Sequence, residues 1–249
     1  MNLPPALMDD PGLRAVLGAL APVRALVVGG AVRNALLGEP VEDIDLATDA
    51  RPERVIALAE AAGLKAVPTG IAHGTVTLVA GGRGFEVTTF RRDVETDGRR
   101  AVVAFSDRLE EDAARRDFTI NALYAGADGA VIDPVGGLPD LAARRLRFVG
   151  DADRRIAEDY LRILRFFRFH ARYGRPGGAD PAALDACARG AAGLARISRE
   201  RIGAELRKLL DAPDPREAVG LMDETGVLAV ILPGADPTRL ARLVAAEPD

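Results

Sequence analysis

Apolar and polar positions follow two different spacings in the first half of the chain. The apolar run at 24–30, which contains valines and is bounded by glycines, predicts a buried strand. The alternating stretch at 43–48 predicts a second strand, and the segments on either side of Gly81-Gly82 predict two more. Helical spacing predicts helices at 9–20, 31–38 and 51–63. The charged, glycine-containing stretch at 91–112 predicts a long mobile loop.

Helical spacing replaces this mixture from Leu138 onward. Just before that point, the stretches DFTINALYA and AVIDPVGG predict a buried, strand-like pair. Helices are then predicted at 138–145, 153–172, 180–192, 198–211 and 214–226. Strands mixed with helices, followed by helices alone, predict an α+β protein with a mixed β-sheet head and a helical region after it.

Composition and charge narrow the class of protein. Apolar residues make up 48% of the 249 residues, and no apolar run is long enough to span a membrane, so we expect no membrane partner. The N-terminus lacks a basic start followed by an apolar stretch, which argues against a secretory signal. Cys187 is the single cysteine, which excludes internal disulfides and suits the cytoplasm. Two histidines and one cysteine argue against zinc. The net charge of −4 means that any nucleic acid must meet a local basic patch.

Two acidic residues and a glycine pair carry the first chemical signal. Strand residues two apart point to the same side, so Asp43 and Asp45 would present their carboxylates together. That arrangement favours a divalent cation, most plausibly Mg²⁺, although a solvated strand end or a helix cap is the alternative. Gly29 and Gly30 lie between a strand and a helix, where backbone amides favour phosphate, although a tight turn would need the same residues. A phosphate site close to a metal site is what nucleotidyl transfer requires.

The stretch GGAVRNALLGEPVEDIDLAT, at 29–48, resembles the first signature of the tRNA nucleotidyltransferase/poly(A) polymerase family, in its bacterial CCA-adding form. The resemblance continues in family order through 115–123, 133–141, 158–169 and 197–210, and covers about 24–235. It implies a nucleotidyltransferase head at 1–140, a helical neck at 141–211 and the start of a helical body at 212–249. Family members usually continue further, so we expect either a truncated chain or a naturally short relative.

The resemblance also implies a catalytic centre. Asp43 and Asp45 would hold two Mg²⁺ ions, one activating the RNA 3′-hydroxyl and one steadying the departing pyrophosphate. Glu86 would be a third carboxylate, with an outward-facing strand residue as the alternative. Gly29, Gly30 and Arg33 would contact the triphosphate, although an isolated arginine in a first helical turn is usually a surface residue. The chain has Asn34 where the family usually has aspartate, which puts a local salt bridge in question.

Two further motifs would hold the sugar and the base. In the stretch at 115–123, the residues implied to grip the sugar are Arg116, Asp117 and Asn121; without the resemblance, Arg115 to Asp117 would be an exposed ion-pair cluster. Asp159 and Arg162 are three apart on a predicted helix and are implied to read the Watson–Crick edges of CTP and ATP. Glu158 would hold Arg162 at i,i+4 spacing, and a solvated helix face is the alternative.

Arginines make the same predicted helix a local positive patch. Arg162, Arg165 and Arg168 recur every three residues, and residues 154–172 carry six arginines against Glu158 and Asp159, a charge of +4 where a triphosphate and an RNA end could meet. We take the phenylalanines there as core. His73 and His170 lack a carboxylate or second histidine at metal spacing, and we take both histidines and Cys187 as structural.

The resemblance therefore predicts addition of C, C and A to the tRNA 3′ end from CTP and ATP, with no protein partner evident. One alternative is a bacterial poly(A) polymerase, which resembles the chain in its head but carries a basic stretch that is lacking here. Another is a CC-only or A-only enzyme; the CC-adding relatives have a shortened loop, and this chain keeps a full one. A non-catalytic relative would be expected to lose Asp43 or Asp45, and both are present.

Overall fold

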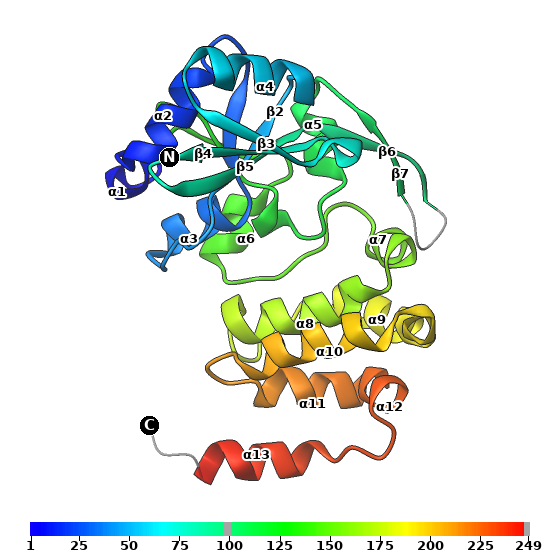
Figure 1. Ribbon diagram of the computed structural model, residues 1–249. Helices are drawn as coiled ribbons and strands as arrows, with labels where there is room; N and C mark the ends of the chain where they lie inside the picture. Colours follow the sequence, from blue (N-terminus) through cyan, green and yellow to red (C-terminus); the bar gives the residue numbers. More distant parts are fainter. Residues whose placement is uncertain (97–100, 247–249) are drawn as a thin grey trace. The chain divides into compact units, whose positions relative to one another are not determined.

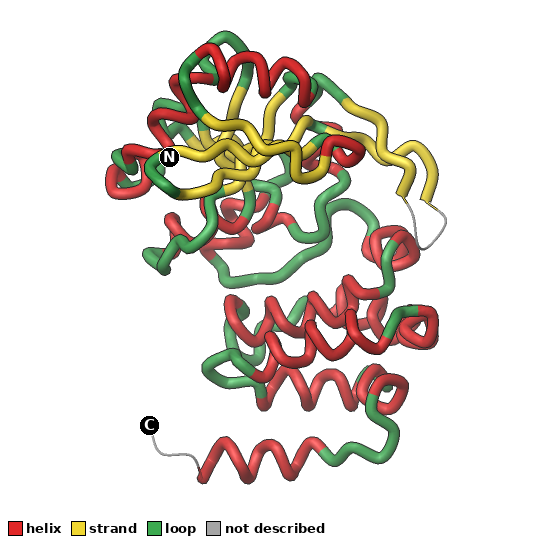
Figure 2. The backbone as a smooth tube through the Cα atoms, viewed as in Figure 1, coloured by secondary structure: helices red, strands yellow, loops and turns green. Residues whose placement is uncertain are grey.

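A computed structural model describes residues 1–96 and 101–246 of the protein. The residues fall into two compact units. The first, which we call the head unit, comprises Met1–Glu95 and Val102–Leu138. The second, which we call the helical unit, comprises the chain from Pro139 on, together with Thr96 and Ala101. From Pro139 on, the described chain contains helices and loops without a strand (Figure 2), so the α+β prediction is confirmed.

A seven-stranded mixed sheet forms the centre of the head unit (Figure 1). Its order is β3-β4-β5-β2-β1-β8-β9, and β2 and β5 pair in parallel whereas the other neighbours pair antiparallel. The four strands expected before residue 90 are confirmed, and β3 was not foreseen. The strand bounds are β1 (Ala25–Val28), β2 (Asp45–Thr48), β3 (Lys65–Gly70), β4 (Thr75–Ala80), β5 (Arg83–Thr89), β8 (Tyr124–Ala125) and β9 (Val131–Ile132).

Helices cover both faces of this sheet. Figure 1 shows α2 and α4 above it and α3 below it, with α2 and α4 packed on β4 and β5, and α3 beside β1. The three predicted helices are confirmed, with a short separate turn, α1, ahead of α2. Gly38 ends α3 in the left-handed conformation (φ 72°), which suits glycine. The bounds are α1 (Pro5–Met8), α2 (Pro11–Ala19), α3 (Gly30–Leu37), α4 (Pro52–Ala61) and α5 (Leu109–Ala114).

The long loop expected at 91–112 is wrong for most of its length. Arg91–Thr96 forms β6 and Ala101–Phe105 forms β7, which pair as a separate two-stranded sheet, and α5 begins at Leu109. The charges obscured the strand signal of the β-branched residues in this stretch, Val94, Thr96, Val102 and Val103. The loop expectation for 97–100 lies outside the described residues.

The helical unit departs from the sequence prediction at one place. The single helix expected at 153–172 is wrong, because Asp159 is extended (φ −154°, ψ 104°) and separates two helices. The predicted helices at 138–145, 180–192, 198–211 and 214–226 are confirmed, and α12 and α13 follow. The bounds are α6 (Gly137–Ala142), α7 (Ala152–Glu158), α8 (Leu161–Tyr173), α9 (Pro181–Gly190), α10 (Arg199–Leu210), α11 (Arg216–Glu224), α12 (Val227–Ile231) and α13 (Pro237–Ala246).

Helix α8 is the centre of the helical core. It packs against α10 and α11, and its Phe166 and Phe167 are fully buried, as is Cys187 on α9. His170 has a carboxylate partner far along the chain: its Nε2 atom lies 3.1 Å from Glu217 Oε1 on α11. This contact joins α8 to α11, in keeping with a structural histidine. No helix within the described residues is long and apolar enough to cross a membrane.

Candidate active site

Asp43, Asp45 and Glu86 line one pocket in the head unit. Asp45 on β2 and Glu86 on β5 are partners in the parallel pairing of these two strands. The pocket has a volume of about 430 Å³ and also contains Ile44, Thr77 and Gly84. The prediction that Asp43 and Asp45 share a strand is wrong, because β2 begins at Asp45 and Asp43 lies in the irregular segment before it. The structure still brings both residues to the same pocket.

The electrostatics of this pocket are those of crowded carboxylates. The pKa of Asp45 is raised. The largest cause is desolvation of its carboxylate by the surrounding protein atoms, although the residue as a whole keeps an exposed surface; the negative charges of Glu86 and Asp43 raise this pKa further. Arg116 opposes the shift. In the described residues, no three side chains of His, Cys, Asp or Glu converge closely enough to enclose a metal ion. The residues present nevertheless fit a hard divalent cation, because carboxylate oxygens are its preferred ligands and its charge would relieve their repulsion.

The glycine pair forms the turn between β1 and α3. Gly29 has a φ of 68°, a conformation that glycine adopts without strain, and its amide donates to the Leu123 carbonyl at 3.0 Å. A side chain at Gly29 would place its Cβ 3.4 Å from Arg116 Nη1, so the glycine lets the two segments lie close together. Gly30 is the first residue of α3. This turn therefore brings a helix N-terminus next to a guanidinium group.

Arg33 is held inside the head unit. Its side chain is buried, which makes the surface alternative wrong. It donates through Nη1 to Asn121 Oδ1, and through Nε and Nη2 to Asn34 Oδ1 at 3.0 and 2.8 Å. Asn34 in turn donates through Nδ2 to the Pro40 carbonyl at 2.9 Å. The amide at position 34 thus orients Arg33, so the local contact questioned for Asn34 is a hydrogen bond rather than a salt bridge.

Arg116 is anchored by two residues that the sequence analysis did not single out. Its Nη2 atom donates to Asp112 Oδ2 at 3.0 Å, and its Nε atom donates to the Tyr124 hydroxyl at 2.9 Å. Tyr124 itself donates to Asp112 Oδ2 at 2.8 Å. Burial by itself lowers the pKa of Arg116, but Tyr124 and Asp112 outweigh it and raise that pKa. Arg116 is therefore a fixed, half-buried cation, and the exposed-cluster alternative is wrong for it.

Asp117 and Asn121 complete this network. Asp117 Oδ1 accepts hydrogen bonds from the Phe118 amide at 2.8 Å and from Asn121 Nδ2 at 3.1 Å. Because Asn121 also accepts from Arg33, one amide side chain connects Asp117 to Arg33. The residues expected to contact the triphosphate and those expected to contact the sugar are therefore adjacent.

Tyr124→Phe is expected to destabilise the head unit by about 1–2 kcal/mol, because it leaves a buried Asp112 oxygen short of one donor while keeping the ring. We also expect weaker nucleotide binding, because Arg116 Nε loses the nearer of its two acceptors and keeps Asp112 Oδ2 at 3.3 Å. Urea unfolding and nucleotide titration measure the two effects. Tyr160→Phe, on the helical unit, is the matched control. An unchanged unfolding curve and nucleotide affinity for Tyr124→Phe would show that the hydroxyl does not hold Arg116.

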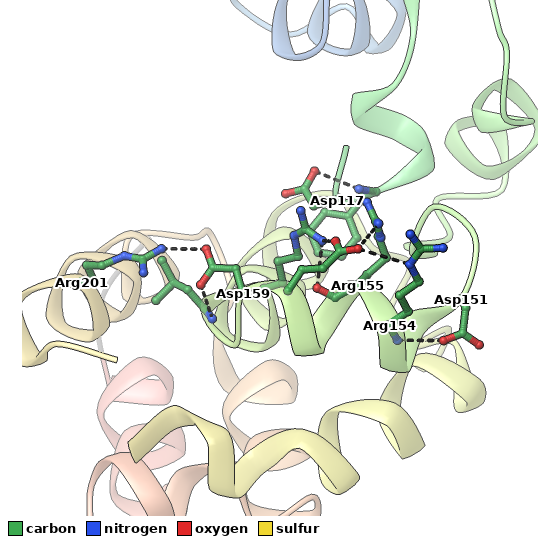
Figure 3. Close-up of polar contacts among 10 residues, drawn as sticks. Asp117, Asp151, Arg154, Arg155, Asp159 and Arg201 are labelled. Atoms are coloured by element: carbon green, nitrogen blue, oxygen red, sulfur yellow. Dashed lines mark hydrogen bonds and ion pairs between the residues drawn. The ribbon is translucent and has the colours of Figure 1, made fainter. Parts of the chain in front are cut away.

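Glu158, at the end of α7, contacts three arginines, of which Arg154 and Arg155 are labelled in Figure 3. Its carboxylate accepts hydrogen bonds from Arg155 and from Arg162 Nη1, the latter at 2.7 Å. It also lies 3.5 Å from Arg154 Nε. Arg162 Nη1 also donates to the Arg155 carbonyl at 2.8 Å. The predicted Glu158–Arg162 ion pair is confirmed, and both side chains are largely buried.

Asp159 is placed differently from its prediction. The expectation that it shares a helix face with Arg162 is wrong, because it lies in the extended break before α8. Its Oδ1 atom accepts from the Leu161 amide at 3.1 Å, and its Oδ2 atom accepts from Arg201 Nη2 at 2.7 Å, as Figure 3 shows. Arg201, on α10, therefore sets the direction of the Asp159 carboxylate.

Arg165 and Arg168 both lie over the ring of Phe169, at 5.3 and 4.3 Å from its centroid. Arg168 also lies 2.7 Å from Glu205 Oε2 on α10. Glu158 and Glu205 thus offset part of the positive charge that was counted along the sequence. Phe169 is buried, as expected, and serves as a surface for both guanidinium groups.

The comparisons with known proteins agree with this architecture. Residues 25–147 match the family model described as "Poly A polymerase head domain", and residues 180–238 match "Probable RNA and SrmB- binding site of polymerase A". A Danio rerio mitochondrial CCA tRNA nucleotidyltransferase 1 is 46% identical over 203 residues, which are 81% of this chain and 47% of that protein. A Geobacillus stearothermophilus CCA-adding enzyme is 43% identical over 225 residues, covering 89% and 54%.

Solved structures show the same likeness. The Bacillus stearothermophilus CCA-adding enzyme in complex with CTP superposes with a TM-score of 0.82 at 39% identity, over 94% of this chain and 57% of that one. The fold is that of the CCA-adding enzyme's nucleotidyltransferase head and the helices after it. The chain belongs to the tRNA nucleotidyltransferase/poly(A) polymerase family. It spans about half the length of the curated relatives that it matches.

Proposed function

We propose that the protein adds C, C and A to the 3′ end of tRNA, using CTP and ATP and releasing pyrophosphate. The observation that carries this proposal is the pocket in which Asp43 meets Asp45 on β2 and Glu86 on the parallel strand β5. Glu86 and Asp43 add their negative charges to the burial that raises the pKa of Asp45, and such a crowded carboxylate pocket favours a divalent cation. The similarity to CCA-adding enzymes supports tRNA as the acceptor.

In the head unit, Asp43 and Asp45 would hold Mg²⁺, with Glu86 as the third carboxylate. When bound, Mg²⁺ polarises the attacking hydroxyl and neutralises charge on the phosphates. Gly29, Gly30 and Arg33 would bind the triphosphate; Asn34 and Asn121 support this role of Arg33 because they fix its guanidinium group. The residues proposed to hold the sugar are Arg116, Asp117 and Asn121.

In the helical unit, Asp159 would accept a hydrogen bond from the amino group of cytosine or adenine, and Arg162 would donate to a ring or carbonyl acceptor. Both bases carry an amino group on the Watson–Crick edge, so one carboxylate can accept both. Glu158 and Arg201 support this proposal because they fix the directions of Arg162 and Asp159. Arg165 and Arg168 would add positive charge for the phosphates. We propose residues 141–211 as the neck that carries base selection, and 212–249 as the beginning of the tRNA-binding body.

We also propose the cytoplasm as the working compartment. The single cysteine, Cys187, is buried, and burial raises the pKa of its thiol, so it neither forms an internal disulfide nor ionises readily. A reducing compartment therefore costs this chain no stability.

The test is incorporation of labelled CTP and ATP, separately and together, into tRNA that lacks its 3′ CCA, in the presence of Mg²⁺. We expect CTP alone to add two residues and ATP to add one residue after them, while tRNA ending in CCA stays unextended. Long tails from ATP alone would identify a poly(A) polymerase, and CC without A would identify a CC-adding enzyme. No incorporation while both nucleotides still bind would contradict the proposal for this chain.

A further inference from the structure

Residues 39–44, which we call the approach segment, connect α3 to β2 without regular secondary structure. Asp43 belongs to this segment rather than to the sheet, so no strand pairing fixes its backbone. Ile44 is buried, but Glu42 and Asp43 are exposed. A second pocket of about 360 Å³ lies beside the segment and is lined in part by Val41, Ile44 and Arg83. Packing therefore supports the approach segment on one side only.

Arg83, the first residue of β5, holds this segment directly. Its Nη2 atom donates to the Glu42 carbonyl oxygen at 2.6 Å, immediately before Asp43. Its Nη1 atom lies 3.5 Å from Asp10 Oδ2, and its Cζ atom lies 5.3 Å from the centre of the Phe85 ring. The planar guanidinium group can make these contacts at once, which a lysine cannot do.

The partners of Arg83 are themselves fixed. Asp10 caps α2 by accepting from the Leu13 amide at 2.7 Å. A Cβ atom at Gly12 would lie 2.8 Å from Phe85 Cζ, so a glycine at this position lets the start of α2 lie against Phe85. That close approach puts Asp10 within reach of Arg83. The start of α2, β5 and the approach segment are thus tied together through one side chain.

We infer that Arg83 is a positioning residue for the metal-binding carboxylate of Asp43. The inference rests on the proposed function of the pocket, in which Asp43 and Asp45 hold a divalent cation. Residues that orient metal ligands are worth about 10–100-fold in metal affinity. Arg83 orients its ligand through the backbone, by fixing the carbonyl that precedes it. No contact between Arg83 and the substrate or the cation is needed.

The test is the binding of Mn²⁺ to the intact chain without RNA or nucleotide, measured by electron paramagnetic resonance. We expect Arg83→Ala to weaken Mn²⁺ binding about tenfold. The direction of this change in Mn²⁺ affinity is informative, because removing a positive charge near a carboxylate pocket would by itself strengthen cation binding. Arg14→Ala is the matched control: it removes another positive charge of the head unit, one whose ion pair with Asp9 is exposed, and should leave Mn²⁺ affinity unchanged.

Two further variants separate positioning from folding. Asp10→Ser keeps a capping side chain on α2 but removes the anionic partner of Arg83, and should weaken Mn²⁺ binding less than Arg83→Ala. Arg83→Lys should restore part of the affinity, since one ammonium group can reach either Glu42 or Asp10. Metal-free nucleotide binding should stay unchanged in all three variants, which a general loss of structure would not permit.

The outcomes distinguish this inference from the proposed function. Asp45→Asn should abolish Mn²⁺ binding. If it does not, the proposed metal site is wrong, and so is the inference that rests on it. If Asp45→Asn abolishes Mn²⁺ binding but Arg83→Ala binds Mn²⁺ as tightly as the unmodified protein, the positioning role of Arg83 is overturned and the proposed site stands.

Discussion

Asp45→Asn is expected to lower CTP and ATP incorporation by more than about 100-fold while leaving the protein folded. Mutation of a residue that only orients a metal ligand already costs about 10–100-fold in metal affinity or activity, and Asp45 is proposed as a ligand itself. It lies on β2 opposite Glu86, so an amide can replace it without moving the strand. Single-turnover incorporation into tRNA lacking CCA measures the effect. Asp9→Asn, which removes one exposed charge elsewhere in the head unit, is the control and should keep its activity.

The same substitution should raise the metal-free melting temperature. The folded-state pKa of Asp45 is raised above its ordinary value of 3.8, so this group favours folding when protonated, below pH 3.8, and that contribution is lost as the pH rises through the raised pKa. At neutral pH the ionised carboxylate opposes folding, and asparagine removes that cost. Adding Mg²⁺ should stabilise the unmodified protein but not Asp45→Asn. A lower melting temperature for the variant would contradict this account of the pocket.

Glu158→Ala is expected to destabilise the helical unit by about 3–5 kcal/mol, the usual cost of breaking a buried ion pair by removing one partner. Arg155 and Glu158 are both about 7% exposed, so their charges are poorly hydrated when separated. Arg162 would also lose the carboxylate that directs its Nη1 atom. We therefore expect a loss of preference for CTP and ATP over UTP and GTP. Urea unfolding followed by circular dichroism measures the stability change.

A matched control separates this effect from a change of surface charge. Asp153→Asn removes an acidic residue from the same helix, but Asp153 and its partner Arg189 are both more than half exposed, so little change is expected. Glu158→Gln keeps the shape and one acceptor of the side chain, and should lie between Glu158→Ala and the unmodified protein. If Glu158→Ala unfolds at the same urea concentration as Asp153→Asn, the arginine cluster is not a stabilising element.

The sequence correctly predicted those elements and contacts that depend on residues close together in the chain. The strand at 25–28 and the helix after it were predictable because a valine run ends at a glycine turn and helical spacing follows. The Glu158–Arg162 pair was predictable because residues four apart on a helix are neighbours. Asp112 could have been found by the same rule, since it lies four residues before Arg116.

The break at Asp159 could not be read from spacing. Arginines and apolar residues keep their helical period through 153–172, and nothing in that pattern shows that Asp159 is extended. What holds Asp159 is Arg201, which lies 42 residues further along the chain. Contacts of this kind depend on how the helices pack, so the direction of a carboxylate depends on tertiary structure that one sequence does not reveal.

The partners of the predicted arginines illustrate the same limit. Charge counting gave the segment at 153–172 a strong positive field, but Glu205 on α10 lies against Arg168 and offsets part of it. Arg33, for which a surface position was the alternative, is buried, and Asn121, 88 residues away, accepts its hydrogen bond. In each case the sequence identified the residue, and the distant partner determined its environment.

The parallel pairing of β2 with β5 also imposes an order of events during synthesis. Asp45 and Glu86 are partners across these strands although α4, β3 and β4 lie between them in the chain. At about 5–20 residues per second, a ribosome needs roughly 2–8 s to extend the chain from one to the other. During that interval β2 has only β1 to pair with, and Asp43 and Asp45 are present without Glu86. The pocket can therefore be completed only after β5 has emerged, seconds after the strand β2 with which it pairs.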